Sequence, residues 1–143
     1  KQLHDYSGRV VIVRGLPATK ESIKNKQWDK QNIIFKNHVN ALELSDLIQQ
    51  SGLVVCRSGY TSVMDLVKIK QSAILIPTPG QPEQEYLADY LTSQKIFYSI
   101  KQKDFVLEEA VKNAREFHCM FPVADMDGYI RIIKKLLRSN ING

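Results

Sequence analysis

The sequence predicts an α/β domain with a doubly wound, mostly parallel sheet. Short apolar runs rich in β-branched residues alternate with segments of helical periodicity. The runs are apolar throughout rather than at every second position, which indicates strands buried on both faces of a sheet. The chain has 143 residues, 43% of them hydrophobic, enough for one such core. We therefore expect a single domain over 1–143, without repeats or a low-complexity linker.

Five segments are expected to form the strands. Each is bounded by turn-forming or polar residues, and each is short enough for a buried strand. The expected strands are 10–14, 32–35, 53–57, 73–76 and 96–99.

The first two helices are predicted from their end signals. Segment 45–50 has Ser45 as its N-cap and is closed by Gly52. Segment 62–70 opens on Ser-Val-Met-Asp, the pattern of a capping box in which the first and last side chains satisfy each other's free N–H groups.

Three further helices follow. Pro82 suits the first turn of a helix over 83–94, and Asp104 is the expected N-cap of a helix from 105 to about 118. Segment 124–143 carries one apolar stripe with its basic residues off that stripe, as an amphipathic helix would.

Charge and cysteine content favour a reducing compartment and an anionic partner. Twenty basic and fifteen acidic residues give a net charge of +5, compatible with an anionic ligand, a nucleic acid or an anionic membrane surface. Cys56 and Cys119 are interpreted as small buried hydrophobes. With no signal peptide pattern and no run of about 20 apolar residues, we expect a cytoplasmic protein. The chain starts without methionine, close to its first strand, which suggests a piece of a longer protein.

The first candidate binding segment follows the strand 53–57. This strand leads into Arg57, Ser58 and Gly59, and a helix begins directly afterwards. The positive end of that helix, with nearby hydroxyl groups, could hold a diphosphate, and a glycine would let a ligand approach the backbone. The alternative is a turn and a helix cap without a ligand. Asp65 has the same two interpretations: it completes the capping box, or it accepts hydrogen bonds from the hydroxyls of a ribose.

The second candidate segment follows the strand 73–76. Three prolines stiffen the loop 77–82, which could hold polar side chains toward a ligand. Gln84 and Glu85 lie in the first turn of the next helix. Glu85 could simply complement the helix dipole, whereas the amide of Gln84 gains little from it and suits sugar hydroxyls.

These two segments resemble the C-terminal domain of GT-B glycosyltransferases, most closely glycosyltransferase family 28. The resemblance runs from about 33 to 107 and is carried in order by 53–65, 73–79 and 83–89. It implies a Rossmann-like half of a GT-B fold that binds a UDP-sugar. The implied donor contacts are the diphosphate for Arg57, Ser58, Gly59, Tyr60 and Thr61, the ribose for Asp65, the sugar for Gln84 and Glu85, and the uracil for Val39 in the loop 39–42.

The resemblance also implies what the chain lacks. The family's first strand and Gly-rich turn have no counterpart before Val10, and its acceptor site and catalytic base lie in an N-terminal domain. We therefore expect a fragment of a two-domain hexosyltransferase that is inactive by itself. No catalytic residue is assigned to this chain; His4, His38 and His118 are expected to be surface or packing residues. Neither a metal nor another cofactor is expected, and the implied reaction is inverting displacement at the anomeric carbon.

Other functions remain open from the sequence. The same domain occurs in nucleotide-sugar hydrolases and epimerases, and in donor-binding subunits of split transferases that pair with a separate acceptor-binding chain. The net charge and the basic segment 124–143 also suggest a nucleic-acid or membrane-binding module. We expect no nucleic acid partner, because a basic face opposite an apolar stripe is typical of a helix packed on its own domain. Peripheral contact with an anionic inner membrane face is the version retained.

Overall fold

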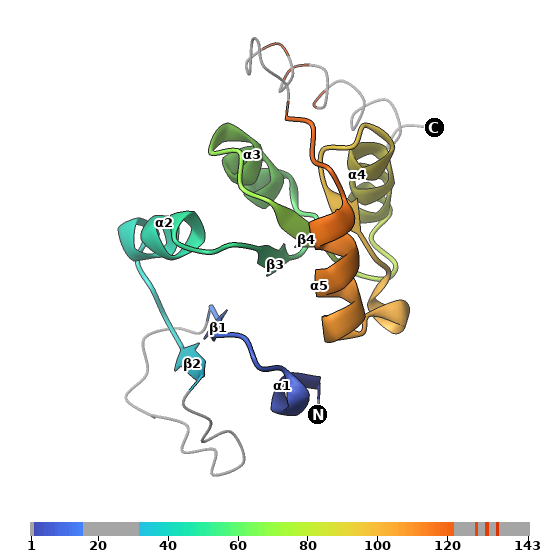
Figure 1. Cartoon of the computed structure of the whole chain (residues 1–143). Helices are drawn as coiled ribbons and strands as arrows, with labels where there is room; N and C mark the ends of the chain where they lie inside the picture. The colour runs from blue at the N-terminus through green and yellow to red at the C-terminus, as the bar shows by residue number, and fades with distance from the viewer. Residues whose placement is uncertain (1, 16–31, 122–127, 129–130, 132–133, 135–143) are drawn as a thin grey trace. The chain divides into compact units, whose positions relative to one another are not determined.

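A computed structural model of the chain describes residues 2–15 and 32–121, together with Gly128, Arg131 and Lys134. The chain divides into two compact units, Lys1–Gln50 and Ser51–Gly143. Figure 1 shows the elements of both units. In the described part of the chain, no helix is long and apolar enough to cross a membrane.

The first unit is built around a parallel pair of strands. Helix α1 (Gln2–Asp5) precedes β1 (Val10–Val13), which pairs with β2 (Ile33–Lys36), and α2 (Ala41–Gln49) follows. The side-chain amide of Asn32 donates hydrogen bonds to two carbonyl groups that precede β1, at 3.1 and 2.9 Å. This amide therefore ties the start of β2 to the segment that leads into β1.

Helix α2 begins four residues earlier than the sequence predicted. Asn40 is its N-cap, and the Asn40 Oδ1 accepts a hydrogen bond from the Glu43 N–H at 2.9 Å. Asparagine caps a helix as well as serine does, and it comes first along the chain, so Ser45 lies inside the helix. The prediction that Gly52 closes this helix is also wrong, because Gln50 is the C-cap in a right-handed conformation.

The second unit contains a three-stranded parallel sheet with the order β3-β4-β5. Its central strand is buried along its whole length. Since alternate residues of a strand point to opposite faces, both faces of this strand are covered. The elements of the unit are β3 (Val54–Cys56), α3 (Tyr60–Lys68), β4 (Ala73–Leu75), α4 (Pro82–Ser93), β5 (Tyr98–Ser99), the 3₁₀ helix η2 (Gln102–Asp104) and α5 (Leu107–Glu116).

The core of the second unit lies between this sheet and its helices. Helix α4 packs against β5, and α5 packs against β4 (Figure 1). The largest fully buried apolar side chains come from both strands and helices, and Phe97 also makes an edge-to-face contact with Phe121 at a centroid distance of 5.7 Å. The predicted α/β fold with parallel strands is confirmed by the strand pairs of both units.

Two helix starts in the second unit differ from the prediction. Helix α3 begins at Tyr60 with Gly59 as its N-cap and without a side-chain cap, so the predicted capping box is wrong. Asp104 ends η2, and α5 begins after Val106, again without a side-chain cap. Helix α4 begins at Pro82, as predicted. Most of the predicted helix over 124–143 lies outside the described residues; Gly128, Arg131 and Lys134 are helical.

The two cysteines are free and half-buried. Burial raises the pKa of the Cys56 thiol to about 11, so the thiol stays protonated at neutral pH. Burial also raises the pKa of Cys119, against a hydrogen bond with Ser72 that lowers it. Neither thiol is therefore suited to act as a nucleophile at neutral pH.

Candidate functional site

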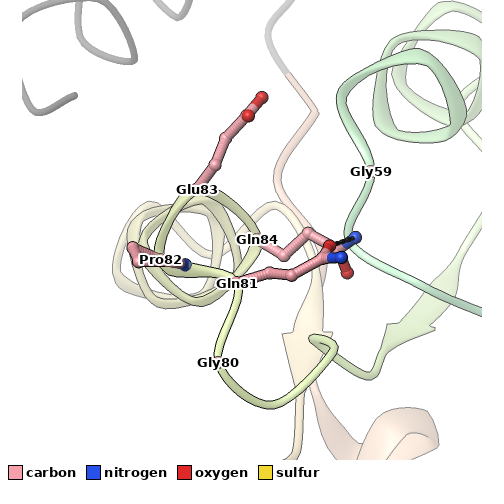
Figure 2. Close-up of a pocket in the computed structure, with 6 residues that line it drawn as sticks. All are labelled: Gly59, Gly80, Gln81, Pro82, Glu83 and Gln84. Carbon is pink, nitrogen blue, oxygen red and sulfur yellow. Dashed lines mark hydrogen bonds between the residues drawn. The ribbon is translucent and has the colours of Figure 1, made fainter.

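The two segments singled out in the sequence meet at one pocket in the second unit. β3 and β4 are parallel neighbours, so the loops that follow them leave the same edge of the sheet. The pocket has a volume of about 430 Å³ and lies where α3 and α4 begin (Figure 2). The first segment contributes Gly59 to the lining of the pocket. The second segment contributes Gly80, Gln81, Pro82, Glu83 and Gln84.

Both helices at the pocket have uncapped N-termini. Gly59 is the N-cap of α3 and has no side chain to offer, and Gln81 is the N-cap of α4 but makes no capping hydrogen bond. A missing cap leaves backbone N–H groups of the first turn unsatisfied, at a cost of about 1 kcal/mol per helix. These N–H groups and the positive ends of the two helix dipoles favour an anion.

The Ser58 side chain forms a hydrogen bond between the two segments and does not line the pocket. This side chain is 1% exposed, and the Ser58 Oγ donates a hydrogen bond to the Gln84 carbonyl oxygen at 2.8 Å. This bond holds the start of α4 against the turn that precedes α3. Since the hydroxyl is used here, a contact of Ser58 with a ligand would come from its backbone N–H. Direct binding by Ser58 stays a prediction.

Replacing Ser58 with alanine is expected to lower the free energy of unfolding by about 0.5 to 1.5 kcal/mol, because one buried hydrogen bond is lost. Urea denaturation measures this change, and titration with UDP measures the accompanying change in affinity. If stability stays at the wild-type value while UDP binding is lost, the hydroxyl acts on the ligand and not as a structural link.

Arg57 links the ends of two strands and the 3₁₀ helix. Its guanidinium donates to the carbonyl oxygens of Ile76 and Pro77, both at 3.3 Å, and to the Gln102 Oε1 at 2.8 Å. In the described part of the chain it forms no ion pair with a carboxylate, and its side chain is exposed. These hydrogen bonds hold the positive charge near the carboxyl ends of β3 and β4, although Arg57 does not line the pocket.

Gln84 and Glu85 hold the loop between β4 and α4. The Gln84 Oε1 accepts a hydrogen bond from the Thr78 N–H at 3.0 Å, and the Glu85 Oε1 accepts one from the Gly80 N–H at 3.2 Å. Gly80 has φ +77°, a left-handed conformation that favours glycine at this turn. Gln84 lines the pocket, whereas the described contact of Glu85 is with the loop itself.

Gln81 is a pocket residue that the sequence reasoning missed. Its Oε1 accepts a hydrogen bond from the Gln84 Nε2, and the two side chains meet beside Gly59 (Figure 2). Its position in the sequence could have identified it. Gln81 directly precedes Pro82, at the N-cap position, where Ser, Thr, Asp or Asn is the usual residue.

Three of the predicted residues lie on α3. Thr61 and Asp65 are exposed and one helical turn apart, so they share the face opposite the buried residues of this helix. In the described part of the chain the Asp65 carboxylate makes no hydrogen bond, and it does not cap the helix. The Tyr60 hydroxyl is buried without a hydrogen-bond partner there, and the Lys134 Nζ lies 5.8 Å from the centroid of the Tyr60 ring.

Val39 belongs to the first unit, where it is half-buried directly before Asn40, so its role at the uracil stays a prediction. His38 and His118 are exposed, and the side chain of His4 lies outside the described residues. Within the described ranges, no three His, Cys, Asp or Glu side chains are grouped so that they could hold a metal ion.

Comparison with known proteins identifies the family of this chain. The model of the glycosyltransferase family 28 C-terminal domain matches residues 2–130. Over 60 residues, or 41% of the chain, the sequence is 42% identical to the UDP-N-acetylglucosamine--N-acetylmuramyl-(pentapeptide) pyrophosphoryl-undecaprenol N-acetylglucosamine transferase of Methylobacterium radiotolerans. That match spans 16% of the length of the relative. Since the family model covers most of the chain, the chain belongs to the glycosyltransferase family 28 C-terminal domain family.

Proposed function

We propose that this chain is the part of a glycosyltransferase that binds the nucleotide-sugar donor, and that its donor is a UDP-sugar. The observation that carries the proposal is the pocket between two uncapped helix N-termini. A nucleoside diphosphate places two negative charges at one spot, and two helix ends stabilise such charges better than one. Membership of the family supports a nucleotide-sugar ligand, and the name of the relative supports UDP-N-acetylglucosamine as the first donor to test.

Each predicted residue has a role in this proposal. The diphosphate lies at the starts of α3 and α4, close to the Gly59 backbone and within reach of the Arg57 charge. Tyr60, Thr61 and the backbone of Ser58 complete that end of the site. The remaining contacts in the second unit are the ribose hydroxyls for Asp65 and the sugar for Gln84 and Glu85. The role of Val39 at the uracil concerns the first unit and stays a separate prediction.

The proposed reaction is displacement at the anomeric carbon of the sugar by an acceptor hydroxyl, with inversion. The bond from the anomeric carbon to the diphosphate breaks, and UDP leaves with the bonding electron pair. The two helix ends and Arg57 stabilise the charge that develops on the leaving diphosphate. The acceptor and the group that removes its proton belong to an N-terminal domain, so the chain by itself should bind the donor without transferring the sugar.

We propose a cytoplasmic location, with peripheral contact at the inner membrane face. The relative is named for a pyrophosphoryl-undecaprenol substrate, which carries a long hydrocarbon chain. An enzyme acting on such an acceptor gains from basic side chains near an anionic bilayer. Arg131 and Lys134 are exposed residues of the segment that could supply them.

Calorimetric titration of the chain with UDP, UDP-N-acetylglucosamine, GDP and dTDP tests the proposal. The uridine nucleotides are expected to bind with a millimolar or lower dissociation constant. This corresponds to a binding free energy of about 4 kcal/mol or more in magnitude. Binding of GDP and dTDP should be at least tenfold weaker. Equal binding of all four would contradict a uridine-specific site, and binding of none would contradict a donor site formed by this chain.

A further inference from the structure

At the pocket, two consecutive hydrogen bonds connect Thr78, Gln84 and Gln81, and chemistry alone determines which atom donates in each. The first bond begins at the backbone N–H of Thr78, which can only donate, so the atom of Gln84 that faces it must be the amide oxygen Oε1. The amide nitrogen of Gln84 therefore faces Gln81. The atom of Gln81 that receives this bond must in turn be its Oε1. One backbone donor thus orients both side-chain amides.

This orientation leaves N–H donors available at the pocket. Each side-chain amide carries two N–H donors. Gln84 uses one of them on Gln81, and in the described part of the chain Gln81 uses neither. Figure 2 shows both amide groups beside Gly59, while the side chain of Glu83 points away from it. The part of the pocket nearest to Gly59 is therefore rich in donors, which suits a ligand that offers oxygen acceptors.

The position of Gln81 in the helix gives a second indication. Gln81 is the N-cap of α4, yet its side chain does not cap the helix. Its backbone already makes the bonds of the turn: the Gln81 N–H donates to the Thr78 carbonyl oxygen at 3.1 Å, and the Gln81 carbonyl oxygen accepts from Glu85. The helix start thus does not require the Gln81 side chain, which contacts Gln84 in the pocket instead.

We propose that Gln81 binds the ligand directly, and that its amide N–H groups donate to an oxygen atom of the nucleotide-sugar. The inference rests on the proposed function and adds a contact that the family resemblance did not assign. The phosphate and sugar oxygens of a nucleotide-sugar both accept hydrogen bonds, and both belong to the part of that molecule that we place in this pocket. Gln84, held by Thr78 and Gln81, supplies the neighbouring N–H donor.

The test is a double-mutant cycle with Gln81→Ala and Gln84→Ala, measured by calorimetric titration with UDP and with UDP-N-acetylglucosamine. Direct binding predicts that Gln81→Ala weakens affinity about 3- to 10-fold, the range of a single lost hydrogen bond. A smaller loss should remain in the Gln84→Ala background, where Gln84 no longer orients the Gln81 amide. Loss for the sugar nucleotide alone places the contact on the sugar, and equal loss for both ligands places it on the phosphate.

Gln94→Ala is the matched control, because Gln94 is an exposed glutamine at the opposite end of α4 and should leave affinity unchanged. Melting temperatures confirm that each variant is folded. Unchanged affinity of Gln81→Ala overturns the inference, and so does a loss that disappears in the Gln84→Ala background, since Gln81 would then act only through Gln84. If the wild-type chain binds neither ligand, the proposed function itself fails and this inference fails with it.

Discussion

Replacement of Asp65 by alanine is expected to weaken UDP binding about 10- to 150-fold while the fold is retained. The estimate corresponds to the loss of a charge-assisted hydrogen bond, about 1.5 to 3 kcal/mol, with the larger effect if both ribose hydroxyls are lost. The fold should persist because Asp65 is exposed and does not cap α3. Titration with UDP and thermal unfolding measure the two quantities.

Asp89→Ala is the control for the loss of a negative charge, since Asp89 is an exposed residue of α4. It should leave UDP affinity within about twofold of wild type, because an exposed charge away from the ligand contributes little. Asp65→Asn keeps the size and one acceptor oxygen, so its affinity should fall between those of Asp65→Ala and wild type. A ribose role for Asp65 is excluded if Asp65→Ala binds UDP as the wild-type chain does.

Replacement of Gly59 by alanine is expected to weaken UDP binding about 10- to 100-fold while the fold is retained. Gly59 has φ −72° and ψ 141°, which alanine adopts freely, and an added Cβ meets no atom within 4 Å. The free energy of unfolding should change by less than about 1 kcal/mol, because alanine restricts the unfolded chain but is a poorer N-cap residue than glycine. The methyl group occupies space beside the backbone where we place the diphosphate, and so removes charge-assisted hydrogen bonds.

Two other glycines separate the effects on folding and on binding. Gly52 precedes β3, and an added Cβ there also meets nothing within 4 Å, so Gly52→Ala should leave UDP affinity unchanged. Gly80 has φ +77°, so Gly80→Ala should lower stability, by about 1 kcal/mol. Thermal unfolding and UDP titration of the three variants give the comparison. Wild-type affinity in Gly59→Ala would show that no ligand approaches this backbone.

The strands could be predicted from sequence because their signal is local. Each apolar run coincides with an observed strand to within two residues at either end, including the fully buried β4. Burial of a whole strand demands apolar side chains at every position, and this demand is visible without knowledge of the fold. Among the described strands only β4 is buried throughout; β2 exposes Phe35 and β3 exposes Val55, so the prediction of burial on both faces is wrong for these two.

Helix starts were harder to predict, because several residues near a start can act as the cap. Asn40 and Ser45 are both good N-caps, and only the observed hydrogen bond to Glu43 identifies the one in use. At Gly59 the pattern failed for another reason: α3 begins without any side-chain cap, and the Ser-Val-Met-Asp pattern lies inside the helix. An uncapped start is costly by itself, which fits a site that a ligand completes.

The sequence by itself determined the fold class, the positions of the strands along the chain, their parallel direction, and the two segments that meet at the candidate site. Only the tertiary structure decided how the side chains of those segments are used. The Ser58 side chain is buried and bonded to the Gln84 carbonyl group. The Gln81 side chain lines the pocket, although a side chain at the N-cap position normally caps the helix. The reason is physical: periodicity reports which residues face the core, whereas a hydrogen bond between residues far apart in the sequence depends on where two loops are brought together.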